Sequence, residues 1–167
     1  MSENSAKILT QLISKDRISE IDQWIAKYPD DQKQSAVMSA LRIVQEQHKF
    51  LTQELMDAVA EYLDMPPIAV YEVATFYTMY EHKAHARHLI NVCTNISCKL
   101  RGSQDIVNYL EDKLHIKMGE ATSDGRFTLR SVECLGACVN APMMQVDKKY
   151  HENLDHEKID RILDEYK

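Results

Sequence analysis

Apolar residues recur every three or four positions through the first half of the chain, the spacing typical of amphipathic helices. Thr52 is a suitable N-cap, and Glu54 then lies in a first turn, where a carboxylate complements the helix dipole. Pro66-Pro67 should end one helix and open the next. We expect the apolar stripes of these helices to form the core of a bundle. The helices are expected over residues 6–13, 18–25, 34–47, 52–63 and 68–80.

The second half of the chain changes to short apolar runs that are typical of strands. The order strand, helix, strand, strand, helix is expected there, with Tyr150 beginning a return strand. We therefore predict an α+β protein, with an N-terminal helical bundle over residues 1–82 and a mixed β-α-β-β-α domain over residues 83–167. The strands are expected near 89–92, 127–133 and 143–146, and the helices after Gly102-Ser103 and after an N-cap at Asp155.

Composition excludes several classes of protein. The 167 residues are 44% hydrophobic and 28% charged, which is enough apolar material for a core. Only four glycines are present, so a Gly-rich phosphate-binding loop, and with it a nucleotide-binding domain, is not expected. The net charge of −6 argues against a nucleic-acid partner.

The first five residues are unlike a signal peptide, and no apolar run approaches the ~18 residues of a membrane helix. A cytoplasmic protein without direct membrane insertion is expected.

The candidate chemistry lies in four cysteines, all between positions 93 and 138. Disulfides are rare in the cytoplasm, so clustered cysteines there favour metal binding or redox chemistry. Cys93 and Cys98 form a Cys-x4-Cys motif, and Cys134 and Cys138 form a Cys-x3-Cys motif. Each pair directly follows an expected strand. If the two strands are parallel, a right-handed crossover places both loops at one edge of the sheet.

Three kinds of site are compatible with these spacings. Four thiolates suit either a tetrahedral zinc or a [2Fe–2S] cluster. Structural zinc most often uses a tighter Cys-x2-Cys, whereas the wider Cys-x4-Cys loop suits a larger inorganic group. Thiol-exchange enzymes favour Cys-x-x-Cys, which neither pair has. The spacing thus favours [2Fe–2S] over zinc, and zinc over other thiol chemistry.

The residues around the cysteines fit an anionic cluster. Gly102 and Gly136 permit a positive φ and a close approach of the backbone. Lys99 and Arg101 follow Cys98 and could offset negative charge near the cysteines, or simply be solvated surface residues.

Other polar residues have a functional and a structural interpretation. Thr94 and Ser97 could donate O–H groups to sulfur or cap the loop. His82, His85 and His88 could bind a metal, but such a run is more often a solvated helix end.

The segments around the cysteines resemble a known family. Residues 93–102 read Cys-Thr-Asn-Ile-Ser-Cys-Lys-Leu-Arg-Gly, and residues 133–142 read Glu-Cys-Leu-Gly-Ala-Cys-Val-Asn-Ala-Pro. Both resemble the thioredoxin-like [2Fe–2S] ferredoxin family, in particular the E subunits of bacterial NADH–quinone oxidoreductase (respiratory complex I). The resemblance begins at about residue 15 and extends to the C-terminus. It also includes residues 28–29, 70–77, 124–128 and 150–154.

This resemblance implies a one-electron carrier within an NADH-oxidising complex. Cys93, Cys98, Cys134 and Cys138 would bind one [2Fe–2S] cluster, and the chain would have no catalytic residue or nucleotide site of its own. The helical bundle would contact partner subunits. The implied partners are the flavin-bearing F subunit, which binds NADH and FMN, and the iron–sulfur G subunit, in the peripheral arm of the membrane-bound complex. Similar modules serve as diaphorase subunits in NAD-linked formate dehydrogenases and hydrogenases. A zinc-stapled interaction module is the alternative from another class.

The chain departs from the family pattern at two turns. Lys49 stands after His48, where a glycine is common, and residues 84–87 replace a usual Pro-x-Gly turn. Both departures lie outside the cysteine loops, so they affect the expected turn geometry and not the expected site.

Overall fold

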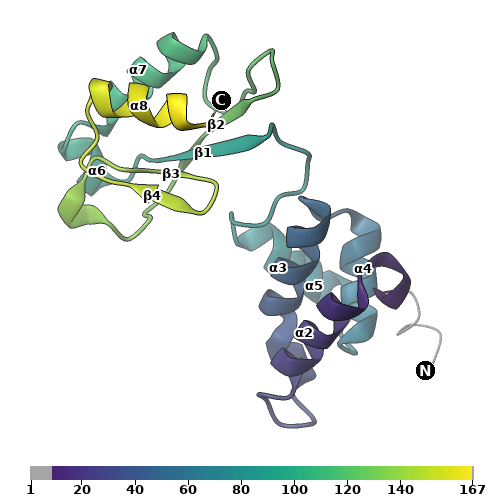
Figure 1. Cartoon of the computed structure of the whole chain (residues 1–167). Coiled ribbons are helices and arrows are strands. Elements are labelled where there is room, and N and C mark those ends of the chain that lie inside the picture. Colours follow the sequence, from purple (N-terminus) through teal and green to yellow (C-terminus); the bar gives the residue numbers. More distant parts are fainter. Residues whose placement is uncertain (1–8, 167) are drawn as a thin grey trace. The chain divides into compact units, whose positions relative to one another are not determined.

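The computed structural model describes residues 9–166 of the chain. The chain divides into two compact units, Met1–Ala84 and His85–Lys167 (Figure 1). None of the helices in the described range is long and apolar enough to cross a membrane.

The first unit is helical, as the spacing of its apolar residues predicted. Residues 9–12 are helical, and the rest of the helix expected over 6–13 lies partly outside the described residues. The last helix ends at Phe76 and not at Tyr80, because the buried Tyr80 hydroxyl donates to the Met38 carbonyl oxygen at 2.8 Å and the chain turns to make this contact. The elements are α2 (Lys15–Ile25), the 3-10 helix η1 (Lys33–Ala36), α3 (Val37–His48), α4 (Gln53–Tyr62) and α5 (Pro67–Phe76).

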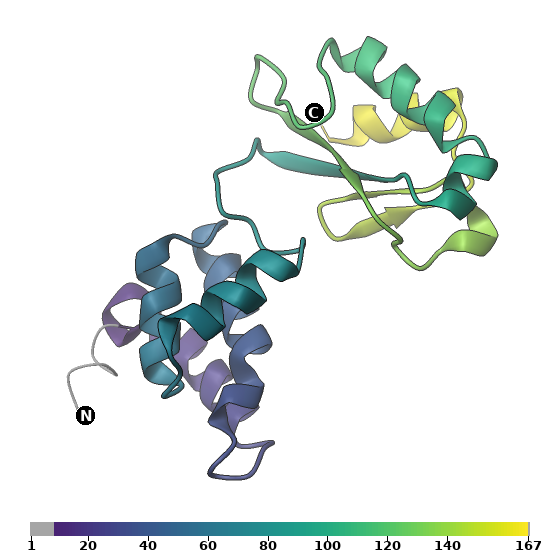
Figure 2. The same ribbon diagram turned by 180° about the vertical axis from the view of Figure 1, so that it is seen from behind.

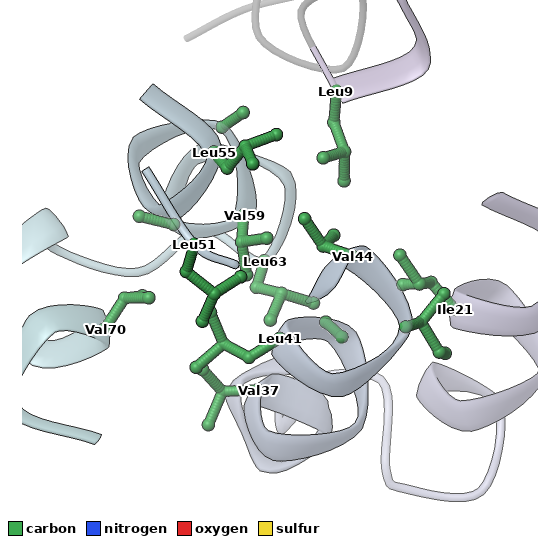
Figure 3. Packing of buried hydrophobic residues seen from close by; sticks show 14 of the residues in the cluster. Leu9, Ile21, Val37, Leu41, Val44, Leu51, Leu55, Val59, Leu63 and Val70 are labelled. Carbon is green, nitrogen blue, oxygen red and sulfur yellow. The ribbon is translucent and has the colours of Figure 1, made fainter. Parts of the chain in front are cut away.

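The apolar stripes of these helices meet in one core. Figure 3 shows Leu41 and Val44 of α3 facing Val59 of α4 and Leu63 just after that helix, with Ile21 of α2 beside them. All five are fully or almost fully buried, so the interpretation of the stripes as core packing is confirmed.

Helix ends in this unit follow the expected signals. The Thr52 side chain accepts a hydrogen bond from the Leu55 amide at 3.2 Å, and Glu54 lies in the first turn of α4. Pro67 is the first residue of α5, a position whose backbone N–H has no hydrogen-bond partner within the helix, so the N–H that proline lacks is not needed there. Lys49, the first departure from the expected family pattern, ends α3 with a φ of 75°. The turn therefore keeps a left-handed conformation although the residue is not glycine.

The second unit is a four-stranded sheet with strand order β2-β1-β3-β4. The pair β1·β2 at one side of the sheet is parallel, whereas β1·β3 and β3·β4 are antiparallel. The return strand expected from Tyr150 is present as β4. The strands are β1 (His88–Cys93), β2 (Phe127–Val132), β3 (Met144–Val146) and β4 (Lys149–His151).

Two longer helices cover one face of this sheet: α7 (Ser103–Leu114), which connects β1 to β2, and the C-terminal α8 (His156–Glu165) (Figure 2). Ile106 and Leu110 of α7 and Ile159 of α8 share a buried cluster with Ile90 and Val92 of β1.

Two further elements lie at the cysteines. The short helix α6 (Ile96–Leu100) lies in a segment expected to be a loop, and the 3-10 turn η2 spans Cys138–Asn140. A helix of five residues is too short to show a repeated apolar period, which is why the sequence pattern did not reveal it.

Candidate functional site

The parallel pair of strands brings the two cysteine motifs to one edge of the sheet. Cys93 is the last residue of β1 and pairs in register with Val132, the last residue of β2. Cys134 follows Val132 by two positions. Parallel strands run in the same direction, so both motifs leave the sheet at the same edge, as predicted.

The second motif, Cys134 to Cys138, is an exposed loop in which the two sulfur atoms lie close together. Cys134 Sγ lies 3.6 Å from Cys138 Sγ, and both residues are exposed. The Gly136 amide donates to Cys134 Sγ at 3.3 Å. Gly136 has a φ of 83°, so the conformation that turns this amide toward the sulfur is one that glycine adopts without strain.

The first motif is buried. Cys93 and Cys98 are each 1% exposed and pack with Ala141 and Met143. Burial, together with the neighbouring thiols of Cys93 and Cys138, raises the pKa of the Cys98 thiol to about 11. All four cysteines are free of disulfides.

The two motifs lie close enough to influence each other. The pKa of Cys138 is raised chiefly by its hydrogen bond with Cys134, and the charge of Cys93 adds to the shift, whereas a hydrogen bond from Ser97 lowers it. Ser97 thus donates to sulfur, one of the two roles considered for it. Thr94 instead bonds to Ser131 Oγ at 2.6 Å and the Val132 carbonyl at 3.3 Å, so it ties the first motif to β2.

Side chains from elsewhere in the unit hold the second motif. The Tyr150 hydroxyl of β4 donates to the Leu135 carbonyl oxygen at 2.8 Å. Asn140 Nδ2 donates to Glu152 at 2.7 Å, and the Asn153 amide donates to the Asn140 carbonyl at 2.7 Å. Nothing in the local sequence pattern indicates that residues 150–153 face the cysteine loop, so these contacts were not predicted.

Residues beside the first motif also have defined positions. Gly102 has a φ of 94° and precedes α7, as its helix-start signal predicted. Lys99 and Arg101 are exposed. Residues 84–87, the second departure from the family pattern, are fixed by the Ala86 amide donating to Thr128 Oγ1 at 2.9 Å.

The three histidines do not come together. His82 contacts the Ala74 carbonyl, His85 contacts the Ala86 carbonyl, and His88 contacts Asp147 Oδ2 at 2.8 Å. Within residues 9–166, no group of three or more His, Cys, Asp or Glu side chains is arranged around a single metal-ion position. The cysteines lie as one buried pair, Cys93 and Cys98, and one exposed pair, Cys134 and Cys138.

Known proteins match most of the chain. The family model described as "Thioredoxin-like [2Fe-2S] ferredoxin" matches residues 21–167. An E subunit (E 2) of the NADH-quinone oxidoreductase of Rhizobium meliloti (strain 1021) is 44% identical over 148 residues, which is 89% of this chain and 87% of that protein. The NADH-quinone oxidoreductase E subunit of Rickettsia felis is 46% identical over 143 residues, which is 85% of this chain and 86% of that protein.

A solved structure shares the fold. The crystal structure of NAD+-reducing [NiFe]-hydrogenase in the H2-reduced state matches with a TM-score of 0.65 and 21% identity, over 78% of this chain. The match spans only 22% of the hydrogenase chain. The family match and the E-subunit relatives together show that this chain belongs to the thioredoxin-like [2Fe–2S] ferredoxin family, whose cofactor is a [2Fe–2S] cluster.

Proposed function

We propose that this chain carries single electrons as the [2Fe–2S] subunit of an NADH–quinone oxidoreductase. The observation that carries the proposal is the convergence of Cys93 and Cys98 with Cys134 and Cys138 at one edge of the sheet. The relatives named as E subunits of this enzyme support it over most of their length.

The arrangement of the donors fits a group with two metal centres. The cysteines form two pairs, one buried and one exposed, and all four thiols are free. Four thiolates, two for each iron, are the ligand set of a [2Fe–2S] cluster, and the family whose model matches residues 21–167 is described by this cluster. We therefore assign Cys93, Cys98, Cys134 and Cys138 as the cluster ligands.

The chain's own residues control the environment of this site. When bound, the cluster supplies reversible one-electron chemistry. The Gly136 amide and the Ser97 hydroxyl donate to thiolate sulfur, which stabilises negative charge there. Burial of Cys93 and Cys98 excludes water from one side of the site, and the exposed Cys134 and Cys138 leave the other side open to a partner.

Partner subunits complete the enzyme in this proposal. The mixed unit, residues 83–167, carries the electron site, and the helical unit, residues 1–82, contacts other subunits. The electron donor is the flavin-bearing F subunit, which binds NADH and FMN, and the iron–sulfur G subunit lies nearby. The chain itself has few glycines and no phosphate-binding loop, so the nucleotide is bound by the partner. We place the assembly in the cytoplasmic peripheral arm of the complex.

The shared fold supports a second candidate, a diaphorase subunit of an NAD-linked hydrogenase or formate dehydrogenase. The genes beside this one separate the two assignments: membrane subunits of a quinone reductase support the first, and a hydrogenase or formate dehydrogenase large subunit supports the second.

The central test is the metal content of the anaerobically purified chain. We expect red-brown protein with about two irons and two inorganic sulfides per chain, and an EPR signal that appears on reduction. Colourless protein with one zinc per chain would contradict the proposal and favour the zinc-stapled interaction module.

A further inference from the structure

The two cysteine pairs differ in how easily a small molecule from solution can reach their sulfur atoms. Cys93 and Cys98 are each 1% exposed and belong to a buried cluster, whereas Cys134 and Cys138 are exposed. Buried structural thiols are inert toward reagents in solution, and accessible thiols react with them. A thiol-reactive molecule therefore reaches the second pair and not the first.

The exposed pair is also arranged so that its two sulfur atoms can bond to each other. Cys134 Sγ lies 3.6 Å from Cys138 Sγ, and a disulfide bond measures about 2.0 Å, so a small approach of the sulfurs closes the bond. Cys134 lies between β2 and η2, outside any helix or strand. Gly136, between the two cysteines, has a φ of 83° and gives the loop the backbone freedom to adjust.

The contacts that hold this loop in place involve its backbone and not its sulfur atoms. The Tyr150 hydroxyl donates to the Leu135 carbonyl oxygen at 2.8 Å, and the Asn153 amide donates to the Asn140 carbonyl oxygen at 2.7 Å. These contacts keep the two cysteines close together whether or not they are bonded. Groups held at such a short distance react with each other far faster than with a second molecule from solution.

We propose that Cys134 and Cys138 are a reversible oxidation site, which forms a disulfide by exchange with a small disulfide such as oxidised glutathione before a cluster is bound. The bond consumes two of the four thiols, so the oxidised chain takes up no cluster until a thiol reduces it. This consequence for the cluster rests on the proposed function, whereas the oxidation site itself does not. Cytoplasmic disulfides are usually transient, and exposed ones are readily reduced, which suits a reversible site.

The reaction consists of two thiol–disulfide exchanges. The thiolate of one cysteine attacks a sulfur of the small disulfide, whose S–S bond breaks, so that a mixed disulfide forms and one thiol is released. The thiolate of the other cysteine attacks the protein sulfur of the mixed disulfide and releases the second half of the reagent as a thiol. Two electrons pass from the protein to the reagent, and the protons of the two cysteines are balanced by those of the two released thiols.

The test treats the reduced, cluster-free full chain with oxidised glutathione, without denaturant, and follows the products by mass spectrometry after alkylation and digestion. Trypsin places each pair on its own peptide, residues 88–99 and residues 131–148. We expect peptide 131–148 to lose two hydrogens at least about ten times faster than the thiols of peptide 88–99 are modified. Dithiothreitol should restore both thiols.

Two variants separate proximity from mere exposure. In Cys134→Ser the remaining Cys138 has no partner in its loop, so it should stay as a mixed disulfide with one glutathione. Ser123→Cys is the matched control, because it places an exposed thiol in the turn before β2, on the separate tryptic peptide 118–126. Its added thiol should likewise stay as a mixed disulfide, while peptide 131–148 of the same variant closes as in wild type.

Three results would overturn the oxidation site: peptide 88–99 reacting first, a bond that links the two peptides, or wild-type peptide 131–148 retaining glutathione on its cysteines without closing.

Two further measurements test the consequence for the cluster. Loading the chain with the cluster should slow oxidation of peptide 131–148 at least about tenfold, because the same thiols are then iron ligands. The oxidised chain should bind cobalt(II), a thiolate-binding ion that does not reduce disulfides, at least about ten times more weakly than the reduced chain. Equal cobalt affinity would show that the disulfide does not block metal binding.

The outcomes also distinguish this inference from the proposed function. A loaded chain that is oxidised as fast as the cluster-free chain and keeps its iron would remove Cys134 and Cys138 from the ligand set, although the oxidation site would stand. Failure of the wild-type chain to hold any cluster would overturn the proposed function, while the glutathione experiment would still decide whether the exposed pair is an oxidation site.

Discussion

Cys93 lies directly opposite Val132 in the parallel pair β1·β2, each as the last residue of its strand. This register joins two cysteine motifs that lie some forty positions apart along the chain. A shift of one strand by a single residue would turn every side chain of that strand to the other face of the sheet. The core residues Ile90 and Leu129, which are fully buried, fix the register and with it the positions of the cysteines.

Removing one buried thiol should abolish the cluster. In Cys98→Ser the hydroxyl replaces a thiolate at a position that is 1% exposed, and an alcohol is a poor ligand for iron there. We expect the iron and sulfide content and the visible absorbance of the purified protein to fall to background. Ser97→Ala is the control: it removes the neighbouring hydroxyl but keeps all four thiols, so its iron content should equal that of wild type. Unchanged iron in Cys98→Ser would refute the ligand assignment.

Replacing Lys49 by glycine should stabilise the helical unit. Lys49 has a φ of 75°, a conformation that costs a residue with a side chain roughly 1–2 kcal/mol and that glycine adopts without this cost. Part of the gain in stability is offset, because glycine has more conformational freedom in the unfolded chain. The expected gain in the free energy of unfolding is about 0.5–1 kcal/mol. Urea unfolding followed by the fluorescence of Trp24, the only tryptophan, reports on this unit.

The matched control for that prediction is Lys83→Gly, an exposed lysine in the same unit whose φ is not positive. This variant should be neutral or slightly destabilising. Equal stabilisation by both variants would show that the left-handed turn is not the cause.

Loss of the hydroxyl at Thr52 should destabilise α4. Thr52→Ala removes the acceptor for the Leu55 amide and should lower the free energy of unfolding by about 1 kcal/mol. Thr52→Ser keeps the acceptor and should retain most of the stability. The same urea titration tests both variants, and identical losses in the two would exclude the capping hydrogen bond as the reason.

The stability of the helical unit should depend on pH through Glu20. A hydrogen bond from Arg42 lowers the pKa of the Glu20 carboxyl below its usual value of 4.5, and Arg17 contributes in the same direction. Because the folded-state pKa is the lower one, the ionised pair stabilises the fold above about pH 4.5, and this contribution disappears as the pH falls through the folded-state pKa. The carboxylate is one-third exposed, so the contribution is modest, about 0.2–1 kcal/mol.

Glu20→Gln should therefore be less stable than wild type at pH 7, and the difference should shrink as the pH falls below 4. Unfolding by urea at several pH values, again with Trp24 as the probe, measures this. Glu61→Gln is the control, since Glu61 is exposed and forms no ion pair within residues 9–166. A difference between wild type and Glu20→Gln that is independent of pH would rule out the carboxylate as its source.

Much of the fold follows from local signals in the sequence. The apolar periods over residues 34–47 and 52–63 correspond to α3 and α4, the Thr52 cap and Pro67 mark where α4 and α5 begin, and the apolar runs before Cys93 and after Asp124-Gly125 are strands. Each of these signals depends only on neighbouring residues, and the core packing of each apolar stripe agrees with it.

Other features were not predictable from local patterns. The helix α6 is too short to show a period, and α5 ends at Phe76 because Tyr80 bonds to Met38 far away in the sequence. The contact of Tyr150 with the Leu135 carbonyl, which holds the second cysteine loop, likewise joins segments that only the sheet brings together.

The sequence by itself determined which residues could bind a cluster, since two cysteine motifs after two strands account for all four thiols. Tertiary structure decided how these thiols are used. The register of β1 and β2 brought the pairs together, α6 buried Cys98 while turning Ile96 and Leu100 outward, and the open second loop left Cys134 and Cys138 accessible. The physical reason is that thiol chemistry is a property of the residue itself, whereas proximity and burial depend on which distant segments pack together.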